Sequence, residues 1–196
     1  MEASKRQAWL VLKTQSGDHT ALDQLLKGVQ ARLFACIRGI TTEDALAEDV
    51  LQDVFVTICT KLGHLRDPTA FGAWSLRIAT REALRRVTRK RWWEGRMVGD
   101  EALSTVPADA PVWEPDPLLR RRLGDALASV SPASRAVLTL HYIAGLSVGE
   151  CADVLGIAVG TAKSRLAYGL EMLRKEMADD DRSELGRPTP RRTGHG

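Results

Sequence analysis

The segment SVGECADVLGIAVGTAKSRLAYGLEML (147–173) decides the fold of the second half of this 196-residue chain. Ser147 and Glu150 have the spacing of a capping box, in which the serine hydroxyl and the glutamate carboxylate satisfy free backbone N–H groups at a helix start. Gly156 follows an apolar run, so the first helix is expected to end there, and a second is expected over 159–177. The tight turn between them predicts a helix-turn-helix.

A helix-turn-helix suits duplex DNA, because its second helix can enter the major groove with N-terminal residues against base edges and phosphates. Helical pairs joined by a glycine turn also occur in proteins that bind no DNA, so this spacing alone does not decide the function. Residues 159–170 contain two basic residues and no acidic one, which favours a polyanionic partner. The candidate contacts are Thr161, Lys163, Ser164 and Arg165.

Another helix is expected just before this motif. Ser131 followed by Pro132 has the pattern of an N-cap with proline at the first helical position, and Gly145 supplies a C-terminal stop. A short helix over 133–144 is therefore predicted.

The first half of the chain is also helical in pattern, and strand signals are almost absent from the sequence. Apolar residues recur every four positions over 46–62, with acidic and amide side chains on the opposite face, which predicts an amphipathic helix. Asp67-Pro68 marks the start of a helix expected over 69–93, with Phe71 and Trp74 in the core and arginines outside. An earlier helix is expected over 21–38. The predicted fold class is all-α.

Charged residues are unevenly distributed along the chain, although its net charge is only +3. Residues 61–96 hold ten basic and three acidic residues, whereas 97–117 hold five acids, four prolines and no base. The acidic, proline-rich stretch has little apolar surface to bury, so it is expected to be a flexible linker between two small domains. The expected divisions are a first domain (1–96), the linker (97–120), a second domain (121–178) and a disordered tail (179–196).

Several classes of function are disfavoured by the sequence. Cys36, Cys59 and Cys151 are far apart and are expected to be small buried residues, with no zinc site or disulfide framework. The four histidines are isolated, and neither a nucleophile–base pair nor a glycine-rich phosphate loop is present, so no enzyme activity, cofactor or metal is expected. Neither a signal peptide nor a membrane-spanning run is evident, which predicts a cytoplasmic protein without membrane insertion.

Taken together, these motifs resemble the extracytoplasmic-function (ECF) sigma factors of the sigma-70 family. Residues 146–175, with the core GTAKSRL (160–166), are similar to the fourth domain of that family. AEDVLQDVF (47–55) resembles its acidic polymerase-binding helix, and FGAWSLRIA (71–79) with the arginines that follow resembles its promoter-melting segment. The two matches cover the chain from about 21 to 93 and from 125 to 177, in the order of the family.

The resemblance implies a transcription initiation factor whose partners are core RNA polymerase and promoter DNA, with an anti-sigma factor as a further candidate. By this resemblance, the polymerase contacts are Asp49, Gln52 and Asp53. The expected contacts to the minus-ten element are His64, Arg66, Arg77, Arg81, Arg85 and Arg86, and those to the minus-thirty-five element are the four residues at 161–165 named above. Trp92 and Trp93 could stack on unpaired bases or pack on a neighbouring helix.

Two other hypotheses fit parts of the pattern. A stand-alone helix-turn-helix regulator would bind duplex operator without polymerase, as a dimer that reads two half-sites. A helical interaction adaptor would bind no DNA, and its arginine run would be only a solvated helix face. The acidic helix at 47–55 argues against the first of these alternatives.

Overall fold

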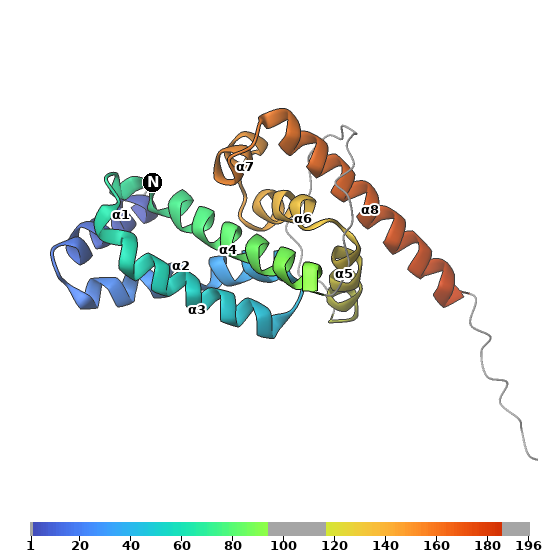
Figure 1. The fold of residues 1–196 in the computed structure, drawn as a ribbon, viewed down its shortest axis with the longest axis horizontal. Helices are drawn as coiled ribbons and strands as arrows, with labels where there is room; N and C mark the ends of the chain where they lie inside the picture. The colour runs from blue at the N-terminus through green and yellow to red at the C-terminus, as the bar shows by residue number, and fades with distance from the viewer. Residues whose placement is uncertain (1, 94–116, 186–196) are drawn as a thin grey trace, which may run out of the picture.

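The computed structural model describes residues 2–93 and 117–185, and its regular elements are all helical (Figure 1). The all-α prediction is therefore confirmed for this part of the chain. The first half consists of α1 (Glu2–Gln15), α2 (His19–Thr41), α3 (Asp44–Lys61), the 3-10 turns η1 (Leu62–His64) and η2 (Pro68–Ala70), and α4 (Phe71–Trp93). The second half consists of α5 (Pro117–Ser129), α6 (Pro132–Leu138), the π-helical turn η3 (Thr139–Ile143), α7 (Val148–Leu155) and α8 (Val159–Leu185).

The helices of the first half form because their apolar residues fall on one face. In α3, Val50, Val54 and Ile58 are fully buried, while Glu48 and Asp49 on the opposite side are exposed. In α2, which begins at the N-cap Asp18, the buried positions repeat at three and four residues in the same way. Phe71 lies fully buried at the start of α4, and Trp74 packs against the core with its ring centroid 5.9 Å from that of Phe71.

Three helix-boundary signals read from the sequence of the second half are present in the structure: the N-cap Ser131, the Ser147–Glu150 capping box and the glycine stops. The Ser131 hydroxyl accepts from the Ser134 N–H with Pro132 in the first turn, and both hydrogen bonds of the Ser147–Glu150 capping box are present. Gly145 and Gly156 have φ values of 69° and 68°, which are left-handed conformations that glycine adopts without strain. The helix-turn-helix of α7 and α8 is therefore present.

Helix boundaries differ from expectation in several places. Neither α1 nor α5 was expected as a helix; α5 begins at Pro117, inside the segment assigned to the linker. The helix expected over 133–144 changes at Leu138 from α-helical to π-helical geometry. Helix α8 continues to Leu185, so the tail assigned from 179 begins within a helix. The rest of the linker, from 97 to 116, and the tail beyond Leu185 lie outside the described residues.

The two halves pack directly against each other. Helix α2 contacts α6 and η3, and α4 contacts α6 and α7, which lie above α4 in Figure 1. Buried side chains from both halves belong to one continuous apolar cluster. Two domains joined only by a flexible linker were expected, so this direct contact is a feature that the sequence did not reveal.

Within the described ranges, no helix has the length and apolar character needed to cross a membrane. In the same ranges, His, Cys, Asp and Glu side chains form no cluster of three or more that could hold a metal ion.

Candidate nucleic-acid and partner interfaces

The outer face of α3 is acidic and open to solvent. Asp49 and Gln52 are exposed, as is their neighbour Glu48. Asp53, one turn after Asp49, is half-buried because its carboxylate forms an ion pair with the Arg86 guanidinium of α4. Of the three residues expected to face a partner, two are therefore available and the third is already engaged.

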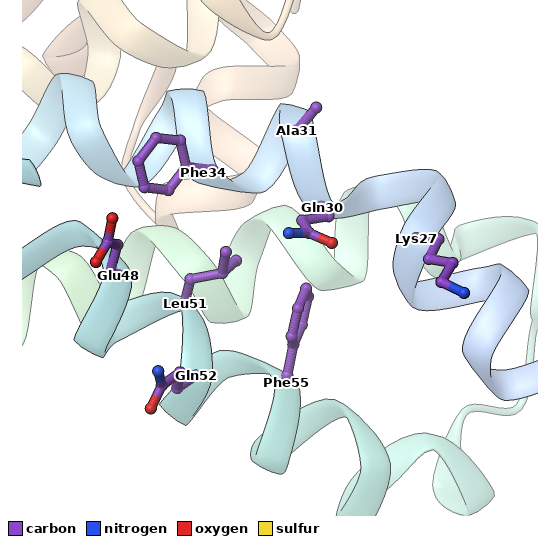
Figure 2. Close-up of a pocket in the computed structure, with 8 residues that line it drawn as sticks. All are labelled: Lys27, Gln30, Ala31, Phe34, Glu48, Leu51, Gln52 and Phe55. Carbon is purple, nitrogen blue, oxygen red and sulfur yellow. The ribbon is translucent and has the colours of Figure 1, made fainter.

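A hollow between α2 and α3 lies beside this acidic face (Figure 2). Its apolar side chains are Phe34 from α2 and Leu51 and Phe55 from α3, and the side chain of Gln52 lies at its edge. An apolar depression with polar groups at the rim is the usual composition of a protein-docking surface. The sequence did not single out Phe34, because the resemblance pointed to α3 alone and nothing in the pattern showed which face of α2 lies beside it.

The exposed face of α4 is basic. Arg77, Arg81 and Arg85 are exposed along the helix, and with Lys61 of α3 and Trp74 the first two line a groove between α3 and α4. Glu82 also lines this groove, which is still net basic. A basic groove beside an aromatic ring suits single-stranded nucleic acid, because cations neutralise phosphates and rings stack on bases. Lys61 was counted in the basic segment but was not identified as part of this groove.

Acidic side chains hold Arg85 and its neighbour Arg86 in place. Arg85 donates from Nε and Nη2 to the two carboxylate oxygens of Glu82, at 3.0 and 2.5 Å. This bidentate contact raises the pKa of Arg85 above its usual value. Arg86 lies 3.5 Å from Glu82 through Nε and also pairs with Asp53. The basic face of α4 is thus pre-arranged, and it is joined to the acidic helix by the Arg86–Asp53 pair.

The loop that carries His64 and Arg66 is fastened by α1. Both side chains are exposed, at and just after the η1 turn. Gln15 at the end of α1 donates from Nε2 to the backbone oxygens of Leu62 and Leu65, each at 2.9 Å. This role of Gln15 was missed, since its two hydrogen bonds join positions about fifty residues apart in the chain and leave no local signal.

The far end of the same loop is ordered by Asp67. Its carboxylate accepts from the Thr69 hydroxyl at 2.6 Å and from the Thr69 N–H at 2.9 Å. The hydroxyl contact, followed by the backbone contact, lowers the pKa of Asp67. The loop between α3 and α4 is therefore held at both ends, with its basic side chains facing solvent.

The candidate contacts of the helix-turn-helix occupy the first turns of α8. Thr161 and Lys163 are exposed, and Arg165 is half-buried. The Ser164 hydroxyl donates to the backbone oxygen of Gly160 at 3.0 Å, a local bond that it can exchange for an external acceptor by rotation about χ1. These residues lie on one helix of the second half, separate from the basic face of α4.

Two aromatic residues form the end of α4, and the sequence left open whether they stack on bases or pack on a neighbouring helix. Trp92 and Trp93 are 64% and 72% exposed, with ring centroids 5.0 Å apart at an interplanar angle of 81°. Neither ring is buried against a neighbouring helix, so both rings are accessible to a ligand.

The cysteines divide into two kinds. Cys36 and Cys151 are fully buried, and loss of hydration raises the pKa of each thiol to about 11. Such thiols are protonated at neutral pH and act as small apolar side chains. Cys59 on α3 is exposed, so the expectation that all three would be buried is wrong for this residue.

This fold, with a helix-turn-helix in one half and adjoining acidic and basic helices in the other, defines a helical DNA-binding factor with a separate partner surface. Comparison with family models agrees with that description: residues 25–93 match "Sigma-70 region 2" and residues 120–173 match "Sigma-70, region 4".

Known proteins extend the match over most of the chain. The ECF RNA polymerase sigma factor SigL of Mycobacterium tuberculosis is 35% identical over 145 residues, covering 69% of this chain and 76% of SigL. CarQ of Myxococcus xanthus, an RNA polymerase sigma factor, is 28% identical over 84% of this chain and 94% of its own length. A solved structure of CnrH in complex with the cytosolic domain of CnrY superimposes with a TM-score of 0.67 at 25% identity, covering 89% of this chain and 99% of that one.

The chain belongs to the ECF sigma factors of the sigma-70 family. As a sigma factor it binds core RNA polymerase and promoter DNA and directs transcription initiation. It is not an enzyme, because catalysis of RNA synthesis belongs to the polymerase.

Proposed function

We propose that the two helical halves divide promoter recognition between them. The region within 1–96 binds core polymerase and opens the minus-ten element, and the region within 121–178 reads the minus-thirty-five element through Thr161, Lys163, Ser164 and Arg165. The observation that carries this proposal is the pair of opposite charge faces on α3 and α4, set beside each other in one domain and separate from α8.

The acidic face is the proposed contact to polymerase. Gln52 lies at the rim of the α2–α3 hollow, whose apolar floor supplies area for a partner to cover, and Asp49 presents an exposed carboxylate on the same helix. Asp53 is the third proposed contact, although its carboxylate must first leave Arg86 or be shared with it.

The basic face and its adjoining loop are the proposed contacts to the opened minus-ten element. His64 and Arg66 on the fastened loop, with Arg77, Arg81, Arg85 and Arg86 on α4, would track the phosphates of the separated strand. The exposed Trp92 and Trp93 offer faces on which unpaired bases can stack.

Two further assignments extend this proposal. A solved sigma factor RpoE, bound to the anti-sigma factor NepR from Bartonella quintana, shares the fold at a TM-score of 0.62 and 22% identity. We propose an anti-sigma factor as a further partner of the present chain. We also propose a cytoplasmic location, where its polymerase and promoter partners are found.

A charge reversal on α3 tests the polymerase contact. Asp49→Arg should weaken the affinity for core polymerase by at least about tenfold, since like charges would then face each other at the contact. Asp49 is better suited to this test than Asp53, because Asp53→Arg would also release Arg86 and disturb α4.

The matched control is Asp125→Arg, which makes the same charge change at an exposed position of α5. Affinity is measured with labelled chain and purified core polymerase, followed by promoter runoff with the reconstituted complex. Equal core affinities for Asp49→Arg, Asp125→Arg and the unaltered chain would refute the assignment of the acidic face.

A further inference from the structure

An apolar side chain is exposed at the start of the second helix of the helix-turn-helix. Val159, the first residue of α8, is 46% exposed, and the adjoining Ala158 and Gly160 are exposed as well. A Cβ atom added at Gly160 would meet no other part of the described chain within 4 Å, so the space beside this turn is open. The first turn of α8 therefore presents apolar surface to solvent.

The core of the second half does not account for Val159. The buried positions at the start of α8 are Ala162 and Leu166, which are four residues apart and form one face of the helix. Val159 lies outside this face, and valine has a lower helix propensity than alanine. Neither core packing nor helix formation therefore requires valine at this position.

The turn before α8 fixes where Val159 lies. The N–H groups of Gly156 and Ile157 both donate to the backbone oxygen of Ala152, the latter at 3.1 Å. Valine is branched at Cβ, which restricts rotation about χ1. The side chain is thus held in place before a ligand arrives, and little conformational entropy is lost when it makes a contact.

An apolar side chain at this place suits one feature of duplex DNA. The N-terminal residues of the second helix of a helix-turn-helix meet base edges in the major groove. Phosphates and most groups on those edges require a polar partner, which valine does not offer. The apolar group in the major groove is the C5-methyl of thymine, and small apolar side chains contact it. Val159 therefore has the chemistry to contact thymine.

Val159 and Lys163 lie one turn apart on the same face of α8. Side chains at this spacing are about 6 Å apart, which is close to two base-pair steps of roughly 3.4 Å. Lys163 is exposed and can neutralise a phosphate, a contact that fixes the position of the helix and carries no sequence information directly. A phosphate contact by Lys163 would therefore place Val159 beside base edges within about two base pairs.

We infer that Val159 contacts the C5-methyl group of a thymine in the minus-thirty-five element and thereby determines sequence specificity at that base pair. The inference rests on the proposed function, because it requires α8 to enter the major groove of this element. It adds an apolar contact to that proposal, whereas the four contacts assigned above act through polar groups.

Deoxyuridine substitution tests the contact, because uracil differs from thymine only in lacking the C5-methyl group. The probe is a promoter fragment selected by the unaltered holoenzyme, in which each thymine of the minus-thirty-five element is replaced in turn. One of these replacements should weaken binding of the unaltered holoenzyme by about fourfold, the value expected when one methyl group is lost from an apolar contact. Equilibrium filter binding at constant salt measures the affinity.

Val159→Ala should remove that sensitivity. Its holoenzyme should bind the unmodified fragment about fourfold more weakly than the unaltered holoenzyme does. The deoxyuridine replacement should then cost nothing further, because the thymine methyl group has already lost its partner. Alanine has a higher helix propensity than valine, so the loss cannot come from a weaker α8.

Val56→Ala is the matched control. Val56 is 64% exposed on α3, so the substitution makes the same chemical change at an exposed helical position in the other half. Its holoenzyme should bind the unmodified fragment as the unaltered one does, and it should keep the effect of the deoxyuridine replacement.

The outcomes separate this contact from the proposed function. The contact is ruled out if no thymine position responds or if the element holds no thymine. It is also ruled out if the Val159→Ala holoenzyme keeps the full deoxyuridine effect, which would assign the methyl group to another residue such as Thr161. In each of these cases promoter-specific runoff by the unaltered holoenzyme would still support the proposed function. Absence of runoff would refute the proposed function and, with it, the contact that rests on it.

Discussion

At the scale of single residues, the second half depends on the reciprocal contacts of Ser147 and Glu150. The Ser147 hydroxyl donates to Glu150 Oε2 at 2.7 Å, the Ser147 N–H donates to the same oxygen at 2.8 Å, and the Glu150 N–H donates to the hydroxyl at 3.3 Å. The hydroxyl contact is the main cause that lowers the pKa of Glu150 below its ordinary value of 4.5. A carboxyl group whose pKa is lower in the folded than in the unfolded chain stabilises the fold at pH values above its unfolded pKa. This stabilisation is lost as the pH falls through its folded pKa.

Ser147→Ala should lower the free energy of unfolding at pH 7 by about 1 kcal/mol, because it removes the cap of α7. It should also flatten the loss of stability seen in the unaltered chain as the pH falls below 4.5, since Glu150 would lose its main partner. Urea unfolding followed by circular dichroism at pH 7 and at several acidic values measures both effects.

Ser129→Ala serves as the control for this change. Its hydroxyl donates to the Ala126 backbone oxygen at the end of α5 and caps no helix start among the described residues. If the two alanine variants lost the same stability at pH 7, or kept the same acid dependence, the capping box would not be what supports the start of α7.

At the scale of helices, the sequence predicted those with a single apolar face and a clear start or stop. Helices α2, α3, α4, α7 and the start of α8 all have such patterns. In α1, by contrast, Trp9 and Leu12 are exposed while Leu10 and Val11 are buried, so four consecutive apolar residues conceal the period. Helix α5 begins at a proline and holds a glycine two residues after its three arginines, which resembles a loop in composition.

The contact between α6 and α8 depends on a small residue in α8. A Cβ at Gly169 would lie 2.7 Å from Leu138 Cδ1 and 3.1 Å from Leu138 Cγ, in a region where both helices are buried. Gly169→Ala should therefore lower the stability of the second half by about 1–3 kcal/mol, in spite of the better helix propensity of alanine. Thermal unfolding of the full chain should show the lower midpoint.

Gly160→Ala provides the comparison for this helix contact, because it lies on the same helix and its added Cβ has no neighbour within 4 Å. Its midpoint should be unchanged or slightly higher. A Gly169→Ala chain as stable as the Gly160→Ala chain would mean that α6 and α8 can separate at no cost, contrary to their close packing.

At the scale of the whole molecule, the sequence predicted the charged helix faces and the helix-turn-helix but not the arrangement of the halves. Charge and motif spacing identified the acidic face, the basic helix and the helix-turn-helix, because each of these features depends on residues that are close together in the sequence. The direct packing of the halves depends on Gly39 against Thr139, and on Arg32 and Arg77 against two backbone carbonyls. Backbone acceptors have no signature in a sequence, and glycine within a helix is equally compatible with open solvent, as Gly28 shows.

The affinity for promoter DNA should fall as the salt concentration rises, because all the proposed DNA-binding surfaces are basic. Each phosphate neutralised by a basic side chain contributes roughly 0.9 to the negative slope of log K against log salt. Lys163→Ala should therefore make that slope shallower by about one for holoenzyme on a promoter fragment selected by the unaltered holoenzyme. Filter binding at a series of salt concentrations measures the slope.

Lys175→Ala is the comparison, because Lys175 is exposed on the same helix but more than three turns from the start of α8. Its slope should equal that of the unaltered chain. If the slope of log K against log salt became shallower by the same amount in both variants, α8 would attract DNA only through its general positive charge, and Lys163 would make no specific phosphate contact.

The clasp between Gln15 and the backbone oxygens of Leu62 and Leu65 has a practical consequence for anyone who dissects this molecule. The matched family region starts at residue 25, so a fragment cut at that boundary would lack α1 altogether. Two loop carbonyls would lose their amide donor, and the loop that carries His64 and Arg66 would be less firmly held. A protein truncated to begin at residue 25 would therefore bind DNA more weakly than the full domain, whereas one that retains residue 2 onward would keep its affinity.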